Sequence, residues 1–107
     1  MAVGNEEQAV IIHSALPLAE SDELFRQLEA LEYQLHSVIA AAGVGEFDGN
    51  EIGQGELTLY MYGPDAEKLF AVIAPFLRRA QLTQFAIAAV RSGPPGSATR
   101  NVRLSAH

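Results

Sequence analysis

The side chains best suited to chemistry in this 107-residue chain are one histidine and two tyrosines. His13 lies in an apolar run, while Tyr60 and Tyr62 alternate with apolar residues of a later segment. If both segments are strands of one sheet, the imidazole and a phenol can share a small pocket and move a proton between them. His13 is therefore the candidate for a catalytic acid or base. The alternative is a partly buried histidine at a subunit interface, with its hydrogen bonds satisfied.

A metal site is not expected. The chain has no cysteine, which excludes disulfides, thiolate nucleophiles and cysteine-ligated zinc. The three histidines, His13, His36 and His107, do not have the spacing of metal ligands. The acidic residues from Glu46 to Glu56 carry oxygen ligands but not the spacing of a calcium loop, so a solvated sheet edge explains them better. No cofactor is expected either, because the glycine-rich stretches precede predicted strands rather than helices.

The chain is acidic, and its charges are segregated along the sequence. Its formal net charge is −6 at pH 7. All 13 acidic residues lie between Glu6 and Glu67, where Arg26 is the single base, whereas Lys68 to His107 holds six bases and no acid. An acidic chain repels a polyanion, so nucleic-acid binding is not expected. The acidic and basic halves of the chain instead make the molecule dipolar. The functional consequence of this charge separation depends on where the fold places each half.

Residues 1–8 are expected to be a frayed tail on a single domain that spans the chain. A first strand is predicted over residues 9–16, followed by a long helix. Ser21 is suited to cap the amino end of this helix, and Gly43 to end it in the left-handed conformation. The predicted buried stripe recurs every three or four residues. Its members are Leu24, Leu28, Leu31, Leu35, Val38 and Ala42.

A hairpin is predicted over residues 45–63, and a second helix over residues 65–80, interrupted by Pro75. Two further strands, over residues 84–91 and 101–104, follow. The buried stripe predicted for the second helix consists of Ala66, Leu69, Phe70, Ile73, Phe76, Leu77 and Ala80.

The element order β-α-β-β-α-β-β predicts an α+β fold of the ferredoxin-like, split βαβ kind, with both helices on one face of an antiparallel sheet. Right-handed crossovers give the strand order 2-3-1-4, with the extra C-terminal strand outside the fourth. The larger apolar residues are assigned to the helix-covered face. They are Val10, Ile12, Leu57, Leu59, Met61, Phe85 and Ile87. The open face then receives Ile11, His13, Thr58, Tyr60, Tyr62, Ala86, Ala88, Val90 and Arg103.

This strand order also separates the charges in space. The acidic hairpin lies at one edge of the sheet, and the last two strands, which carry arginines, lie at the other. The acidic edge is expected to hold Glu46, Asp48, Glu51 and Glu56, and the basic edge Arg91, Arg100 and Arg103.

Two short segments resemble a known group of proteins. Residues 45–53 (GEFDGNEIG) and 62–66 (YGPDA) are similar to a pattern of small uncharacterised bacterial proteins. The resemblance implies a bacterial source and a family without an assigned reaction. It therefore carries no catalytic residues over to this chain.

The open face is too apolar to be merely solvated, which favours a small non-enzymatic interaction or regulatory module, acting as a homodimer or with a protein partner. Its expected interface or ligand residues are His13, Thr58, Tyr60, Tyr62 and Arg103. One alternative is a sensor with a small-molecule ligand in a pocket at this face, and another is an enzyme of the dimeric ferredoxin-like barrel kind that uses His13. Because no apolar stretch reaches about 18 residues and the amino end does not resemble a signal peptide, we expect no membrane contact and a cytoplasmic location.

The absence of cysteine and of clustered histidine predicts that metals do not stabilise the fold. Thermal unfolding is expected at the same temperature in EDTA and with added Zn²⁺, Mg²⁺ or Ca²⁺. A reproducible upward shift of several degrees with one of these ions would contradict this prediction.

Overall fold

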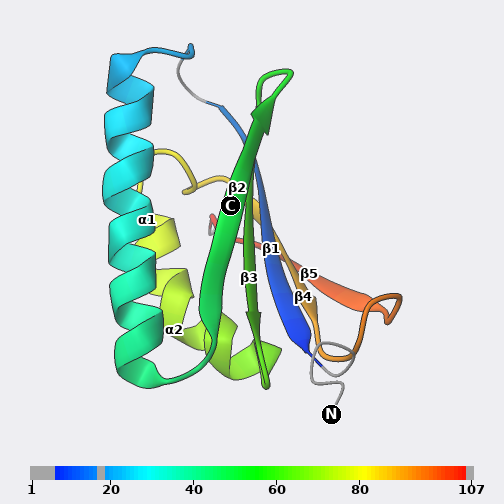
Figure 1. Cartoon of the computed structure of the whole chain (residues 1–107). Coiled ribbons are helices and arrows are strands. Elements are labelled where there is room, and N and C mark those ends of the chain that lie inside the picture. The colour runs from blue at the N-terminus through cyan, green and yellow to red at the C-terminus, as the bar shows by residue number, and fades with distance from the viewer. Residues whose placement is uncertain (1–6, 17–18, 106–107) are drawn as a thin grey trace.

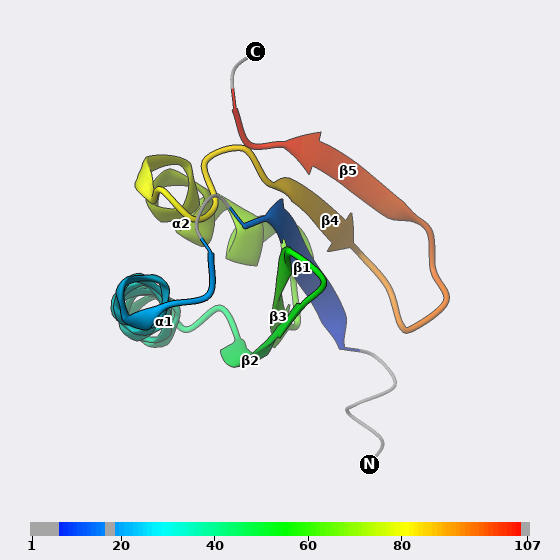
Figure 2. The ribbon, with the colours of Figure 1, turned by 90° about the horizontal axis from the view of Figure 1, so that it is seen from above.

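The computed structural model describes residues 7–16 and 19–105. This part of the chain forms an α+β fold, in which two helices cover one face of a five-stranded antiparallel sheet (Figures 1 and 2). The elements in chain order are β1 (Gln8–Ala15), α1 (Asp22–Ala42), β2 (Glu46–Gly53), β3 (Glu56–Gly63), α2 (Ala66–Arg79), β4 (Ile87–Arg91) and β5 (Thr99–Arg103).

The first strand begins within the segment that was expected to be a frayed tail. Residues 1–6 of the predicted frayed tail lie outside the described residues, but Gln8 already begins β1. The side-chain oxygen of Gln8 accepts a hydrogen bond from the backbone N–H of Ala66, the first residue of α2, at 2.8 Å. The carbonyl of Glu7 accepts one from Arg91 at 3.2 Å. These two contacts tie residues 7 and 8 to the domain.

Helix α1 begins and ends where its capping residues predict. The hydroxyl of Ser21 accepts a hydrogen bond from the N–H of Leu24 at 3.2 Å, and Gly43 ends the helix with φ 66°. The predicted stripe holds as far as Leu35, but Ile39 is then buried in place of Val38 and Ala42. Val38 is half-buried because it lines the groove between the two helices.

Helix α2 runs through Pro75 to Arg79 and is capped by Asp65, whose carboxylate accepts from the N–H of Lys68 at 3.1 Å. The next strand begins later than predicted, at Ile87, because residues 81–85 form turns. The hydroxyl of Thr83 donates to the carbonyl of Leu77 at 2.7 Å and holds these turns against α2. In place of the predicted Phe76 and Ala80, which are half-buried, α2 also buries Ala74. Its full set of buried residues is Ala66, Leu69, Phe70, Ile73, Ala74 and Leu77.

The strands follow the order β2-β3-β1-β4-β5, so β1 is the middle strand. In an antiparallel sheet, residues that pair across strands project from the same face. Val10 pairs with Met61 and Val90, and all three are buried. Ile12 likewise pairs with Leu59 and Ala88 under the helices.

This register corrects the predicted faces of β4. Ala86, Ala88 and Val90 were expected on the open face, but they are buried on the helix side. Phe85 and Ile87, expected in the core, are 74% and 38% exposed. The reason is that alternate residues of a strand face opposite sides of the sheet and paired residues share a side. Once Val10 and Ile12 face the helices, their partners Val90 and Ala88 must do so too.

A bulge interrupts the alternation of β2. Residues 46, 48 and 50 would share one face of a regular strand, but the register of β2 shifts between Phe47 and Gly49. Asp48 is the extra residue of this irregularity. As a result, the amide of Asn50 reaches back and donates to Glu32 on α1, while Glu51 lies on the face with Tyr60.

Two glycines allow the segment that enters β2 to lie in close backbone contact with the end of β3. A Cβ built on Gly63, at the end of β3, would lie 2.2 Å from the carbonyl oxygen of Val44. A Cβ built on Gly45 would lie 2.0 Å from the carbonyl oxygen of Tyr62. Real Cβ atoms do not approach this closely, so the entry into β2 requires glycine at both positions.

We expect Gly63→Ala to lower the free energy of unfolding by about 2 kcal/mol or more, because the added methyl group must displace backbone. Gly53→Ala is the matched control, since a Cβ there meets nothing within 4 Å. The measurement is urea unfolding at constant slope. Equal midpoints for the two variants would show that the close approach is not a constraint.

Candidate functional site

The face of the sheet that the helices leave uncovered is the candidate site, and we call it the open face (Figure 2). The register arranges it in three cross-strand rows, each running from β2 through β3, β1 and β4 to β5. The first row is Glu46, Tyr62, Ala9, Arg91 and Thr99; the second is Gly49, Tyr60, Ile11, Ala89 and Asn101; the third is Glu51, Thr58, His13, Ile87 and Arg103.

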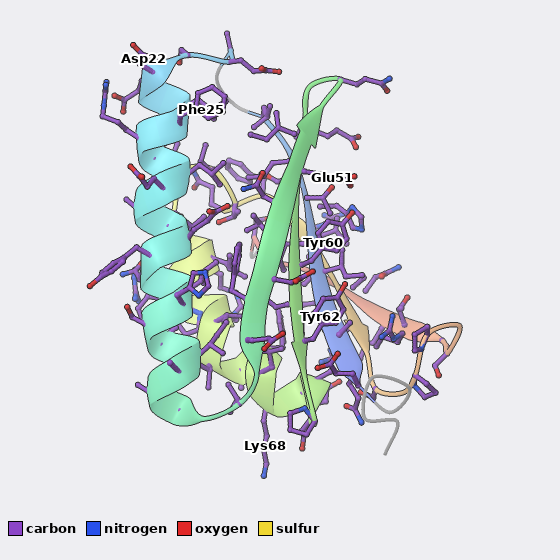
Figure 3. All side chains as sticks on the ribbon, in the orientation of Figure 1. Asp22, Phe25, Glu51, Tyr60, Tyr62 and Lys68 are labelled. Atoms are coloured by element: carbon purple, nitrogen blue, oxygen red, sulfur yellow. The ribbon has the colours of Figure 1, made fainter. Side chains whose placement is uncertain are left out.

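The centre of the open face is apolar and partly exposed. Ile11 lies between Tyr60 and Ala89, and all three are half-buried. Ile87 continues this strip in the next row, beside His13. Figure 3 shows Tyr60 and Tyr62 on the side of the sheet that faces away from the helices. A contiguous apolar strip on an uncovered face is typical of a contact surface.

Opposite charges flank this strip on its two sides. Glu46 and Glu51 lie on β2, at one edge of the sheet. Arg91 on β4 and Arg103 on the far edge strand β5 lie on the other side. The charges that are segregated along the sequence are therefore also segregated across the open face.

Arg100 does not join this basic side, which corrects the sequence expectation. It pairs with Val90, so it projects to the helix side of β5. There its guanidinium donates to Glu67 on α2, with Nε 3.1 Å from the carboxylate, and lies over the ring of Phe70. Arg91 remains on the open face but also donates to the carbonyl of Gly93 at 2.9 Å.

The predicted histidine–tyrosine pair is on one face but is not set up for proton transfer. His13 is exposed and lies between Thr58 and Ile87. The hydroxyl of Tyr60 donates at 2.6 Å to Glu51, on the side away from β1. This hydrogen bond raises the pKa of Tyr60, with desolvation and the negative charge of Glu51 adding to it. Tyr60 therefore holds its proton against a carboxylate rather than offering it to His13.

Hollows suited to a small molecule lie mainly elsewhere. A groove of about 690 Å³ runs between α1 and the end of α2, on the helix layer. Its lining includes Leu31, Tyr33, Val38, Phe76 and Leu82. A smaller hollow of about 400 Å³ lies at the β2–β3 turn, and its lining includes Glu51, Glu56 and Thr58.

Among the described residues, no three histidine, aspartate or glutamate side chains gather closely enough to hold a metal ion. In that same part of the chain, neither helix has the length and apolar character needed to cross a membrane. Comparison with protein-family models, curated proteins and solved structures found no match to this chain.

Sequence reasoning placed Thr58, Tyr60, Tyr62, His13 and Arg103 on the open face, and the structure brings them together there. The sequence analysis did not predict that Ile87 and Ala89 belong to the apolar strip of the open face, and it did not predict the groove between the helices. The strip could have been found from the register of β1, because Ile87 and Ala89 pair with His13 and Ile11. The groove depends on how the helices are spaced, which no pattern in the sequence reports.

The bond between Tyr60 and Glu51 makes a testable prediction. Because the carboxylate stabilises the neutral phenol, we expect Glu51→Gln to lower the pKa of Tyr60 toward its usual value of about 10. The raised pKa also means that this bond stabilises the fold below pH about 10, and that its contribution is lost as pH rises through the pKa of Tyr60. The measurement is the pH titration of the Tyr60 ring carbon by NMR. Identical curves for the wild type and Glu51→Gln would contradict the assignment.

Proposed function

We propose that this protein is a non-enzymatic interaction module that associates with a second copy of itself through the open face. The observation that carries this function is an apolar strip, centred on Ile11 and Tyr60, with carboxylates on one side and guanidiniums on the other. A face of this kind complements itself, as the two identical surfaces of a homodimer must. Burying the apolar strip supplies the affinity, and the charges select the partner.

The fold supports this assignment. We place the chain among ferredoxin-like, split βαβ domains, with β5 as an additional strand that widens the open face. The order β2-β3-β1-β4 and the two helices on one side support that placement. With five strands about 4.8 Å apart and a rise of about 3.3 Å per residue, the sheet presents a patch about 20 Å across. The outline of that patch, on the order of 400 Å², is smaller than the about 800 Å² per partner of a standard interface, so the proposed dimer is among the small interfaces.

A small-molecule sensor is the second candidate function. The groove between the helices favours it, because its volume of about 690 Å³ is within the range of ligand pockets. This groove is on the layer opposite the open face, so the two functions would involve different surfaces. A ligand in the groove would shift the NMR signals of Tyr33 and Phe76 and leave those of Ile87 unchanged.

An enzyme that uses His13 is the least supported of the three functions. The hydroxyl closest to that role, on Tyr60, is bonded to Glu51. The bacterial source, the cytoplasmic location and the absence of a cofactor remain predictions from the sequence.

The proposed function is tested by light scattering at micromolar concentration with matched variants. The wild type is expected at twice the monomer mass of 11.5 kDa. Tyr60→Asp and Ile87→Asp, on different strands of the open face, are each expected to weaken the dimer at least tenfold by placing a charge in its apolar centre. Tyr33→Asp is the control, because Tyr33 is 75% exposed on α1, in the helix layer.

Circular dichroism verifies that each variant is folded. A monomeric wild type over the whole concentration range would contradict the proposed function. So would equal weakening by Tyr33→Asp and by the two variants of the open face.

A further inference from the structure

We propose that the two-fold axis of this dimer runs parallel to the strands and passes over β1, so that the acidic side of each copy covers the basic side of its partner. This arrangement rests on the proposed function and specifies how the two open faces meet. It follows from three features of the structure: the central position of β1, the pairing of residues in rows, and the side of β1 on which each charge lies.

The position of the axis follows from the position of β1. Two strands lie on each side of β1, so an axis over it lets all five strands of one face cover the other. A rotation about such an axis exchanges the two sides of the sheet and keeps each row at its own height along the strands. Each row is therefore laid over the same row of the partner in reverse order.

The third row shows the consequence for charge. It reads Glu51, Thr58, His13, Ile87 and Arg103 from β2 to β5. When this row is laid in reverse order over the third row of the partner, Glu51 lies opposite the partner's Arg103, and Arg103 lies opposite the partner's Glu51. His13 lies at the axis, opposite the partner's His13. The third row therefore contributes two attractive contacts, one at each rim of the interface.

In the other two rows, the side chains complement those of the partner in size or chemistry. In the second row, the ring of Tyr60 meets the small side chain of the partner's Ala89, and Ile11 meets the partner's Ile11 at the axis. In the first row, Tyr62 meets the partner's Arg91, a favourable contact between a ring and a guanidinium. Large residues thus lie opposite small or complementary ones, as the packing of two aligned sheets requires.

The competing symmetry is a two-fold axis in the plane of the interface but perpendicular to the strands. That rotation keeps each strand on its own side, so β2 would cover the partner's β2. The carboxylate of Glu46 would then face the partner's Glu51, and Arg91 and Arg103 would lie on the same side of the interface as the partner's two guanidiniums. Like charges opposed across an interface suppress association, which favours the parallel axis.

Charge reversal distinguishes the two axes. With the parallel axis, Glu51→Arg and Arg103→Glu each set like charges against each other, so each variant is expected to weaken the dimer at least tenfold at low salt, where screening is least. The double variant Glu51→Arg/Arg103→Glu restores opposite charges and is expected to regain the affinity of the wild type. An equimolar mixture of the two single variants is expected to form a mixed dimer, because both of its contacts then join opposite charges.

The matched control is Arg100→Glu, which makes the same change on the same strand but on the helix side, beside Glu67. It is expected to leave the dimer unchanged. The dissociation constants are measured by sedimentation at two salt concentrations. If the wild type dimerises and Tyr60→Asp disrupts it, but neither single charge variant weakens it, the parallel axis is wrong and the proposed function stands. If the wild type is monomeric throughout, both are wrong.

Discussion

The antiparallel register of β1 against its two neighbours is the constraint on which the rest of this structure depends. β1 contributes alternate residues to the two faces of the sheet, and each of them pairs with residues that share its face. Once Val10 and Ile12 are buried under the helices, Ile11 and His13 must lie on the open face. The same pairing decides the faces of β3 and β4, and so which side chains form the core and which lie on the open face.

The strand order converts a pattern along the sequence into a pattern in space. The acidic half of the chain supplies β2 at one edge, and the basic half supplies β4 and β5 at the other. β1 lies between them and carries no Asp, Glu, Lys or Arg. The open face is therefore apolar in the middle and oppositely charged on its sides, a distribution that suits a symmetric partner whose axis lies over β1. Arg100 is absent from this surface because its pairing with Val90 sets it on the helix side, where its ion pair with Glu67 joins β5 to α2.

Local signals in the sequence predict much of this fold, whereas its non-local geometry decides the remainder. The caps at Ser21 and Gly43, and the alternation of β3, are properties of short segments, so their elements were predicted correctly. The faces of β4 could not be judged by size, because small residues such as Ala88 pack beneath α2 while the larger Ile87 remains exposed. Likewise, hydrophobic alternation alone did not reveal the bulge in β2. Five residues of the candidate site were placed correctly because they lie on strands whose phase was clear, but the contact of Tyr60 with Glu51 depended on that bulge.

The central claim is that two copies of this chain meet through their open faces, and isotope-filtered NMR of a mixed labelled and unlabelled sample tests it most directly. Tyr60 and Ala89 lie on opposite sides of β1 within one copy, with Ile11 between them. Our account predicts cross-peaks between the Tyr60 ring of one copy and the Ala89 methyl group of the other, and between the Ile11 side chains of the two copies. Cross-peaks confined to residues of the helix layer, such as Tyr33, would contradict it, as would a sample without any cross-peaks between copies.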